Sequence, residues 1–326
     1  MVERPVELSI VIVSWNVKDL LRACLESLRA QWPFGEPDAA GRAEVFVVDN
    51  ASGDSTSTML ALEFPWAKLI ANPQNVGFTK ANNQAIIQSS GRYVLLLNPD
   101  TEVLPGGLER MAGFMDLHPD VGMLGPQLLF PDGTVQSSRR RFPTMVTALI
   151  ESTVLQRWLP NHPSLNAYYV ADRSNDEVQE VDWVVGACLL VRREVIEQVG
   201  ILDQRFFMYS EELDWCYRAK RASWKVMYLP EAKVVHHEAR SSDQNVLTRN
   251  IHFHNSKCEF FAKHHGPWQG LALRVFILLT FVFLIAEDTA KLLLISRNRS
   301  MRRQRIAVLA AAARWHLFRI LGREGA

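Results

Sequence analysis

The chain has 326 residues, and because a domain usually takes roughly 150 residues it holds one large domain with an appendage or two modest domains. Its hydrophobic fraction of 48% and charged fraction of 22% are those of ordinary globular proteins, which excludes disordered, collagen-like and low-complexity chains. The formal net charge of +1 provides no overall field for nucleic acid and argues against a dedicated DNA-binding protein.

The cysteines indicate a reducing compartment. Cys24, Cys188, Cys216 and Cys258 lie far apart and form no C-x-x-C pair, so neither a zinc ribbon nor a disulfide framework is expected. The first apolar run, residues 8–13, is too short for an export signal and continues directly into polar residues. We therefore expect the bulk of the chain to stay in the cytoplasm.

The first hundred residues alternate between strand and helix patterns. Apolar, largely β-branched runs predict strands at 8–13, 44–48, 68–70 and 93–97. Apolar residues at three- and four-residue spacing predict helices between these strands, at 20–28, after 54 and at 79–89. Such alternation predicts an α/β, Rossmann-like fold with a mainly parallel central sheet, flanking helices and ligands beyond the carboxyl ends of the strands.

The middle of the chain predicts a less regular series of elements. Residues 106–131 read as a helix and a turn, and residues 136–171 as a loop with a short helix. A buried strand is expected at 181–191 with a close backbone approach at Gly186, then a helix ended by Gly200. Two closing strands are expected, at residues 225–228 and 232–235, and the second leads into His236.

Polar residues follow three of the predicted strands at the same edge of the sheet. Ser14 and Asn16 follow the first strand, Asp49 ends the second, and Asn98 and Asp100 follow the fourth. Each alone is typical of a turn or a helix cap. Three such groups at equivalent points of a parallel sheet predict a binding site.

Two of the polar positions suit a divalent cation. Asp100 follows a proline and a buried strand, so its carboxylate has little freedom, and His236 ends another predicted strand. Mg²⁺ or Mn²⁺ bound by one or two protein ligands completes its shell with water and diphosphate oxygens. The alternative for His236 is a neutral, hydrogen-bonded imidazole.

An acidic cluster begins another predicted helix. Glu211, Glu212 and Asp214 follow Ser210, a residue suited to an N-cap. Such acids commonly stabilise the first turn of a helix, and Asp214 is spaced to pair with Arg218. The alternative is that one of the glutamates is a general base.

Asparagines and a glycine surround the start of the helix expected at 79–89. Asn75, Gly77, Asn82 and Asn83 flank backbone N–H groups that could face an anion. The chain contains no G-x-G-x-x-G, P-loop or G-x-S-x-G motif, which disfavours dinucleotide dehydrogenases, P-loop enzymes and α/β-hydrolases.

The C-terminal region is apolar and then basic. Residues 287–326 hold nine Lys and Arg against three acidic residues, and the uncharged apolar run before them, residues 275–286, has twelve residues. A membrane span needs roughly 20 apolar residues, so we expect a helix lying in the membrane interface, attracted by anionic lipid. The alternative is a soluble helical hairpin packed on the main domain or on a second subunit.

Seven ordered segments together resemble the motifs of family-2 inverting glycosyltransferases with the GT-A fold, more narrowly their rhamnosyltransferase-like branch. The resemblance covers roughly residues 6–265, and the segments are residues 8–16, 47–54, 75–78 with 82–83, 97–100, 181–187, 206–216, and 235–236 with Ser241 and Ser242.

The resemblance implies a role for each candidate residue. Asp100 matches the carboxylate of the family's metal motif and His236 a C-terminal metal ligand, while Glu212 matches the catalytic base, with Glu211 as a substitute. Two departures are Asn98 where the family has Asp, and Glu rather than Asp at the base. Asp49 is expected to contact the base or the ribose of the nucleotide sugar. The other residues expected to contact the nucleotide sugar are Ser14, Asn16, Asn75, Gly77, Asn83 and Asn98.

The resemblance also implies partners and a domain division. The donor would be a dTDP- or UDP-sugar, and the acceptor a polyprenyl-linked or other glycan of the bacterial surface, glycosylated at the inner face of the membrane. Residues 1–265 would form the catalytic domain and residues 266–326 a membrane-associated helical region. The alternatives are a sugar-nucleotide nucleotidyltransferase, which would need a glycine- and arginine-rich first loop, and a non-catalytic sugar-nucleotide-binding protein.

Overall fold

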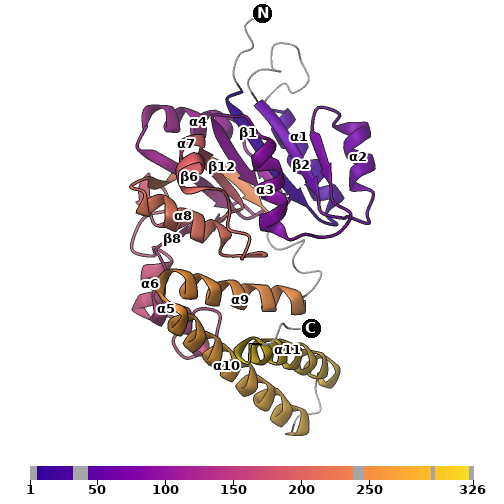
Figure 1. Ribbon diagram of the computed structural model, residues 1–326, viewed down its shortest axis with the longest axis vertical. Coiled ribbons are helices and arrows are strands. Elements are labelled where there is room, and N and C mark those ends of the chain that lie inside the picture. The colour runs from indigo at the N-terminus through magenta and orange to yellow at the C-terminus, as the bar shows by residue number, and fades with distance from the viewer. Residues whose placement is uncertain (1–5, 32–42, 238–245, 295–297, 323–326) are drawn as a thin grey trace, which may run out of the picture. The chain divides into compact units, whose positions relative to one another are not determined.

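The computed structural model describes residues 6–31, 43–237, 246–294 and 298–322 (Figure 1). Ser241, Ser242, Arg297 and Arg323 lie outside the described residues. The chain divides into two compact units. The first consists of Met1–Phe142, Tyr169–Phe207 and Glu211–Ser241, and the second of Pro143–Tyr168, Met208–Ser210 and Ser242–Ala326.

The elements of the first unit, in chain order, are β1 (Leu8–Ser14), α1 (Lys18–Arg29), β2 (Ala43–Asp49), α2 (Thr56–Glu63), β3 (Lys68–Ala71), α3 (Phe78–Gln88), β4 (Tyr93–Leu97), β5 (Thr101–Val103), α4 (Gly107–Leu117), β6 (Val121–Leu129), β7 (Val135–Gln136), β8 (Arg139–Arg140), β9 (Gln179–Val181), β10 (Trp183–Val184), β11 (Cys188–Arg192), α7 (Arg193–Val199), α8 (Glu211–Arg221) and β12 (Lys225–His236). Those of the second unit are α5 (Met145–Ile150), a short 3-10 helix η1 (Val154–Arg157), α6 (Pro163–Tyr168), α9 (Val246–His265), α10 (Pro267–Leu294) and α11 (Arg299–Ile320).

A 10-stranded mixed sheet forms the centre of the first unit, with the main order β3-β2-β1-β4-β11-β6-β12-β5. Strands β1 to β4 run parallel, β11 runs antiparallel between β4 and β6, and β12 is parallel to β6. The carboxyl ends of β1, β2, β4 and β12 therefore lie at one edge of the sheet, together with the amino end of β11. The expected α/β fold with a mainly parallel central sheet is confirmed.

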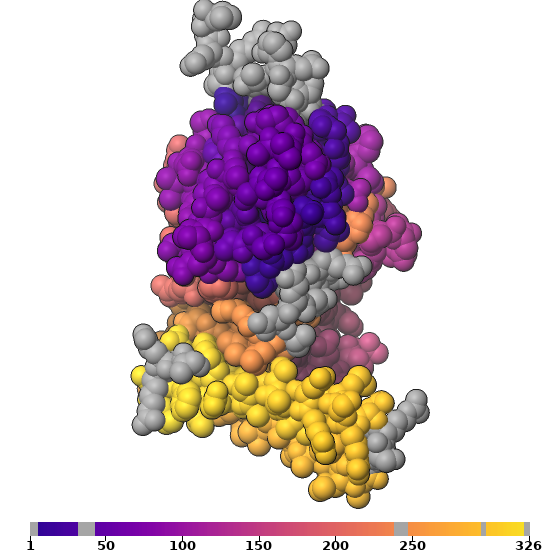
Figure 2. Space-filling view, turned by 90° about the vertical axis from the view of Figure 1, so that its right-hand side faces the viewer, coloured from indigo at the N-terminus to yellow at the C-terminus, as the bar shows by residue number. Residues whose placement is uncertain are grey.

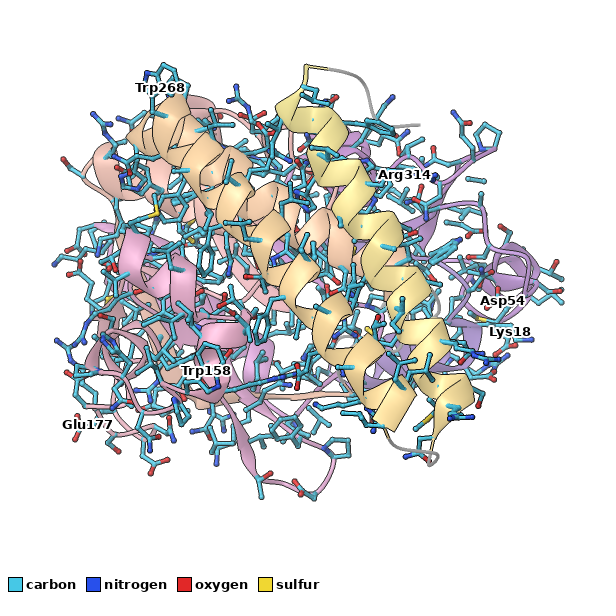
Figure 3. The ribbon with its side chains drawn as sticks, turned by 90° about the horizontal axis from the view of Figure 1, so that it is seen from below. Lys18, Asp54, Trp158, Glu177, Trp268 and Arg314 are labelled. Atoms are coloured by element: carbon cyan, nitrogen blue, oxygen red, sulfur yellow. The ribbon has the colours of Figure 1, made fainter. Side chains whose placement is uncertain are left out.

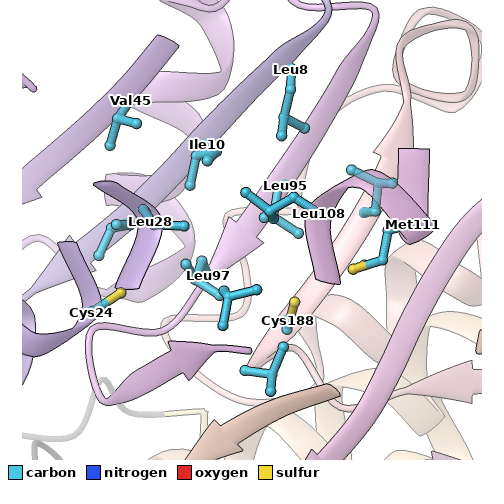
Figure 4. Packing of buried hydrophobic residues seen from close by; sticks show 14 of the residues in the cluster. Leu8, Ile10, Cys24, Leu28, Val45, Leu95, Leu97, Leu108, Met111 and Cys188 are labelled. Atoms are coloured by element: carbon cyan, nitrogen blue, oxygen red, sulfur yellow. The ribbon is translucent and has the colours of Figure 1, made fainter. Parts of the chain in front are cut away.

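Helices cover the sheet (Figure 1). A buried hydrophobic cluster contains residues of the central strands together with residues of α1, α2 and α4. Cys24 and Leu28 of α1 and Met111 of α4 contact this cluster beside Leu97 of β4 and Cys188 of β11 (Figure 4). Residues of β1 that point the other way are also buried, as expected for a sheet covered on both faces. Burial on both faces explains why these strands are almost continuously apolar.

One central strand, β6, is not predicted from the sequence. Residues 106–131 were expected to form a helix and a turn, but they contain α4 and then the nine-residue strand β6. The strand holds two glycines and a proline, a composition that favours turns. A Cβ on Gly125 would lie 2.8 Å from the side chain of Val184, so close packing accounts for at least one of these glycines.

Two further expectations on strands are corrected. The single strand expected at 181–191 is three separate strands: β9 pairs with β12, β10 pairs with β8, and β11 pairs with β4 and β6. The two strands expected at 225–228 and 232–235 are one strand, β12, whose register against β6 shifts between Leu229 and Lys233. The helix ended by Gly200 is confirmed as α7.

The second unit is helical. In it α9 packs against α10 and α11, which also pack against each other, and in Figure 2 the yellow atoms of α11 lie along the gold atoms of α10. The compact units thus group α9 with the C-terminal helices, whereas the expected boundary at residue 265 leaves α9 with the catalytic domain. The functional division into residues 1–265 and 266–326 stays a prediction.

Helix α10 is longer than the uncharged run of the sequence suggests. Its 28 residues have a mean hydropathy of 2.2 over the best 18-residue window, which is long and apolar enough to cross a membrane by length and composition. Leu279, Val282 and Phe283 lie exposed on one side, while Leu273 and Ile277 are buried on the other. Figure 3 looks onto α10 and α11 and labels Trp158, Trp268 and Arg314 in this unit.

Candidate active site

The two expected metal ligands meet at the edge of the sheet. Nε2 of His236 lies 3.4 Å from Oδ1 of Asp100, and both side chains are buried. The approach follows from strand pairing, because Thr101 at the start of β5 pairs with His236 at the end of β12. The backbone N–H of His237 also donates to the carbonyl of Asp100 at 2.9 Å. Residues far apart in the sequence are thus held side by side by the sheet.

A buried glutamine fixes the imidazole of this pair. Nδ1 of His236 lies 2.8 Å from Oε1 of Gln136, a residue of β7. With Nδ1–H donating to this amide oxygen, the lone pair of Nε2 would be directed to a cation bound beside Asp100. A metal-binding histidine typically donates its other N–H to an oxygen in this way. The residues present therefore fit a divalent cation.

Among the described residues, no cluster of three or more carboxylate, imidazole or thiol groups is positioned to hold a metal ion. A site with two protein ligands suits Mg²⁺ or Mn²⁺, which take their remaining ligands from water and phosphate oxygens. The amide of Asn98, where the family has a carboxylate, lies two residues before Asp100 and is half-buried.

Glu212 is brought to the same edge by the loop that precedes β11. The N–H of Asn98 donates to the carbonyl of Ala187 at 2.9 Å, and the N–H of the adjacent Gly186 donates to Oε1 of Glu212 at 3.4 Å. A Cβ on Gly186 would lie 3.4 Å from Cβ and Cγ of Glu212. The glutamate side chain thus lies on the glycine, where the sequence predicts a close approach. Glu212 is thus connected to Asp100 through Gly186, the adjacent Ala187 and the hydrogen bond between Ala187 and Asn98.

The two glutamates share a poorly solvated position. Glu211 is buried and Glu212 half-buried, and Oε2 of each has no hydrogen-bond partner within the described part of the chain. Burial raises the pKa of both carboxyl groups, and the neighbouring charge of Glu212 raises that of Glu211 further. Such a pair holds a proton more readily than an ordinary glutamate, which suits acid–base chemistry near neutral pH.

The third acid of the cluster has a structural role. Asp214 is fully buried and accepts a hydrogen bond at 2.8 Å from Nε of Arg218, one helical turn further along α8. Arg218 also donates to the carbonyl of Ile201 at 2.9 Å. The alternative reading of Asp214 as an ion-pair partner is the one that the geometry bears out.

The carboxyl end of β2 forms a hydrogen-bonded loop with the end of β1. Asp49 is buried, and its carboxylate accepts from the N–H of Ser52 at 3.0 Å and from Oγ of Ser57 at 2.6 Å. Asn16 has a positive φ of 54°, and its Oδ1 accepts from the N–H of Gly53 at 2.7 Å. Oγ of Ser14 is buried without a partner in the described ranges. These residues shape the loop beside the site, and Ser14 retains an unused polar atom.

Asn75 and Gly77 lie in the loop before α3. Nδ2 of Asn50 donates to Oδ1 of Asn75 at 2.9 Å, and the same oxygen accepts from the N–H of Gly77 at 3.0 Å. Gly77 has a φ of 90°, and a Cβ there would lie 2.7 Å from the ring of Phe207. Gly77 is therefore required by both backbone conformation and packing.

Backbone N–H groups at the start of α3, where the sequence suggests an anion site, already have partners within the fold. The N–H groups of Phe78 and Thr79 both donate to the carbonyl of Phe207, at 2.9 Å and 3.4 Å. Asn83 is 1% exposed, and its amide donates to the carbonyl of Leu202 and accepts from the N–H of Leu202. The polar groups that seemed available for a nucleotide join α3 to a segment more than a hundred residues away. We therefore leave Asn83 out of the proposed site.

Two residues near the site had no signal in the sequence. Gln136 follows a turn with Gly133 at a φ of 84°, but nothing local links it to His236, a hundred residues away. Arg140 pairs with Trp183 across β8 and β10, and its positive charge opposes the effect of burial on the pKa of Glu212. Its proximity to an acid depends on a strand pair that the sequence does not predict.

Known proteins resemble this chain in sequence. The sequence model of Glycosyl transferase family 2 matches residues 9–200. The N-acetylglucosaminyl-diphospho-decaprenol L-rhamnosyltransferase of Mycobacterium tuberculosis is 32% identical over 241 residues, covering 71% of this chain and 78% of that protein. Rhamnosyltransferase WbbL of Escherichia coli is 27% identical over 150 residues, covering 42% of this chain and 56% of the relative.

The fold is also found among solved structures. A mannosyltransferase from Pyrobaculum calidifontis, PcManGT, in complex with GDP-Man and Mn²⁺, has a TM-score of 0.53 and 16% identity, covering 98% of this chain and 88% of that one. The fold is that of the GT-A glycosyltransferases. The chain belongs to glycosyl transferase family 2, and its expected rhamnosyltransferase-like character is confirmed.

Proposed function

We propose that this glycosyltransferase moves a sugar, L-rhamnose by likeness to its relatives, from a dTDP- or UDP-linked donor to a polyprenyl-diphosphate-linked saccharide in cell-surface glycan synthesis. The relatives from Mycobacterium tuberculosis and Escherichia coli, by their names, transfer rhamnose, the first of them to a lipid-linked acceptor. One observation carries the proposal. The Asp100–His236 pair and Glu212 lie at one edge of the sheet, joined through Asn98, Ala187 and Gly186.

Asp100 and His236 serve the donor. They would hold Mg²⁺ or Mn²⁺, which when bound supplies positive charge for the diphosphate that leaves. Gln136 keeps the proton of His236 on Nδ1, so that Nε2 stays available as a ligand. Asn98 contributes an amide and no charge at this edge, which leaves Asp100 as the carboxylate that meets the cation.

Glu212 serves the acceptor. Its carboxylate removes the proton of the acceptor hydroxyl while that oxygen forms a bond to the anomeric carbon and the bond to the diphosphate oxygen breaks. Glu211, the more buried of the two, keeps its own proton, because two neighbouring carboxylates in a poorly solvated position do not both ionise. Attack opposite the leaving group inverts the anomeric configuration. A positioned base of this kind contributes about 10²–10⁴-fold to the rate.

The roles are tested by separating binding from turnover. Glu212→Gln should lower transfer of radiolabelled donor by roughly 10²–10⁴-fold while leaving donor binding with Mn²⁺, measured by titration calorimetry, unchanged. Asp100→Ala should lose both activity and metal-dependent binding. Glu109→Gln, at an exposed acid on α4, is the matched control and should behave as wild type.

Equal loss of donor binding in Glu212→Gln and Asp100→Ala would show that the two roles are misassigned. Proton NMR of the wild-type product checks the stereochemistry. A product that keeps the anomeric configuration of the donor would rule out the single displacement.

The second unit supplies a membrane-binding face. Leu279 and Phe283 of α10 are exposed, and the ring of Phe283 meets that of Trp158 with centroids 5.8 Å apart. Exposed arginines follow on α11, among them Arg303 and Arg314. Each basic residue near an anionic leaflet contributes about 1 kcal/mol, and buried apolar area adds to this attraction. The chain would thus lie on the inner face of the cell membrane, where a lipid-linked acceptor is held.

Flotation with vesicles that contain phosphatidylglycerol tests this face. The double substitution Leu279→Asp and Val282→Asp should abolish flotation, because it introduces charge into the apolar surface of α10 without touching the buried side. Leu62→Asp on α2, at a leucine 77% exposed, is the matched control and should float as wild type does. Undiminished flotation of the double variant would contradict the assignment of α10 as the membrane contact.

A further inference from the structure

A turn of unusual backbone conformation precedes α8, the helix that carries Glu212. Tyr209 has a φ of 69° and Ser210 a φ of 63°, and in the described ranges no other two neighbouring residues with side chains share this left-handed conformation. An N-cap, the role that the sequence suggests for Ser210, normally has an extended backbone instead. Such strain persists only where the surrounding structure holds it, and it is commonly found at functional sites.

Helix α9 holds this turn. Oγ of Ser256, a residue of α9 that is 1% exposed, donates to the carbonyl of Met208 at 2.8 Å. Phe253 lies three residues earlier on the same side of α9, and its ring meets that of Tyr209 with centroids 5.7 Å apart. The turn, Met208–Ser210, and α9 belong to the same compact unit. Two side chains of one helix thus support the residues that carry the strain.

The residue before the turn is held by the first unit. The carbonyl of Phe207 accepts hydrogen bonds from the first two N–H groups of α3, at 2.9 Å and 3.4 Å. The chain therefore leaves the first unit after Phe207 and returns to it at the peptide bond between Ser210 and Glu211, where α8 begins. The backbone angles of Tyr209 and Ser210 set the direction in which the chain enters α8.

Polar contacts hold the carboxylate of Glu212 only weakly. Its Oε1 accepts the N–H of Gly186 at 3.4 Å, which is long for a hydrogen bond, and its Oε2 has no partner in the described part of the chain. A carboxylate held in this way depends for its position on the backbone that carries it. Glu212 is the second residue of α8, so its backbone follows almost directly on the turn.

We propose that Ser256 is a positioning residue for the base: by holding the strained turn, it fixes the first residues of α8 and with them the carboxylate of Glu212. The inference rests on the proposed function, in which Glu212 removes the proton of the acceptor hydroxyl. It adds that the helical unit has a part in the transfer step besides membrane binding. Without the hydrogen bond the turn relaxes toward an ordinary backbone conformation, and the base loses alignment with the hydroxyl.

The first test is Ser256→Ala in the full chain. It should lower kcat for transfer roughly 10-fold, while KM for both substrates stays within about twofold of wild type. Calorimetric binding of the donor with Mn²⁺ should be unchanged. Ser300→Ala, at an exposed serine of α11, is the matched control and should leave all of these quantities at their wild-type values.

A second comparison shows whether Ser256 acts through the base. In a chain that carries Glu212→Gln, adding Ser256→Ala should lower the residual rate by less than about twofold, because a residue that only positions the base has no effect once the base is gone. A further loss of roughly 10-fold in that background would show that Ser256 acts elsewhere, and it would overturn the inference.

Ser210→Gly tests the role of the strain. Glycine adopts the left-handed conformation without steric cost, so adding Ser210→Gly to Ser256→Ala should restore transfer to within about threefold of wild type. Ser210→Val is the matched comparison and should restore nothing, because a β-branched side chain disfavours a positive φ. If Ser210→Gly restores no more activity than Ser210→Val, the turn is not what Ser256 controls.

The inference and the proposed function fail in different ways. A wild-type rate in Ser256→Ala, beside the expected loss in Glu212→Gln, would overturn the inference alone. A raised KM for the donor in Ser256→Ala would also overturn it, since the hydroxyl would then serve donor binding. Loss of helical circular dichroism in Ser256→Ala would show that the hydroxyl only supports the fold. A wild-type rate in Glu212→Gln would instead overturn the assignment of the base itself.

Discussion

The two compact units both bury ionisable groups, and burial affects these groups in opposite directions. In the first unit it raises the pKa of Glu211 and Glu212, so these acids hold protons more readily than usual. In the second it lowers the pKa of His254 and His316 to about 3, so both rings stay neutral. The cause is the same, since loss of water disfavours the charged form of either group.

The difference lies in what surrounds each cluster. The glutamates lie at the edge of the sheet where strands end, and substrate can supply their missing partners. The histidines are enclosed by helices beside Arg274, whose Nη2 donates to Asn255 at 2.9 Å and to Glu259 at 3.0 Å. Because arginine can only donate, His316 must accept through Nδ1, which faces Nη1 at 3.4 Å. Both clusters keep buried polar atoms without a hydrogen-bond partner in the described residues, Oε2 of each glutamate and Nδ1 of His254 and Nε2 of His316, but only the glutamates lie where strands end.

The largest test of this contrast is Arg274→Met. Arg274 is 8% exposed, and its removal leaves Asn255 without this donor and leaves Glu259 with Arg319, whose Nη2 lies 3.7 Å from Oε1. We expect a loss of about 2–3 kcal/mol in the free energy of unfolding, as for a broken buried ion pair. Urea unfolding followed by circular dichroism measures it. Donor binding by the first unit should be unchanged.

Arg314→Met on the exposed side of α11 is the matched control and should change the stability by less than about 0.5 kcal/mol. A loss of donor binding in Arg274→Met would break the contrast, because the polar centre of the helical unit would then support the site as well.

A smaller effect is expected from pH, with opposite signs in the two units. The pKa of His254 is about 3 in the folded chain and near 6.5 when unfolded, so the unfolded state takes up the proton first and stability falls as pH drops below 6.5. Between pH 7.5 and 5.5 this histidine costs about 1 kcal/mol. His254→Gln should therefore lose less stability over that interval than wild type.

Glu212 should act in reverse. Its folded pKa lies above the unfolded value, so proton uptake favours the folded state at low pH and the contribution is lost as pH rises through the folded pKa. Glu212→Gln should thus lose more stability than wild type on going from pH 7.5 to 5.5. His118→Gln, at an exposed histidine after α4, serves as control for both. Parallel pH curves for all variants would refute the contrast.

The sequence predicts the edge of the sheet well, because the strand ends depend on local order. Strands β1, β2 and β4 begin and end close to the expected residues, since their runs are almost continuously apolar. Parallel neighbours deliver their carboxyl ends to one edge, so Asp49 and Asp100 could be assigned to the site from strand ends alone. The proximity of Asp100 and His236 also follows once β12 is known to close the sheet.

The sequence fails where a polar group finds its partner through tertiary packing. Asparagine is a residue type that often binds ligands, but the amide of Asn83 donates a hydrogen bond to the carbonyl of Leu202, 119 residues away. Gln136 orients His236 only because β7 pairs with β6, a strand hidden by its glycines and proline. Local propensity cannot distinguish an amide that awaits a substrate from one that the fold has already used.

The smallest effect, and the sharpest, is expected from Gly186→Ala. The φ of Gly186 is outside the left-handed region, so alanine adds no backbone strain, and its methyl group would lie 3.4 Å from Glu212 Cβ and Cγ. Stability should stay within about 0.5 kcal/mol of wild type, whereas transfer should fall roughly 3- to 10-fold, because a base displaced by a fraction of an ångström loses alignment with the hydroxyl.

Gly113→Ala in α4, where a methyl meets nothing within 4 Å, should keep full activity. Steady-state rates and melting temperatures of both variants decide the matter. Undiminished transfer by Gly186→Ala would mean that the carboxylate need not lie against this glycine, and the base would then be sought in Glu211.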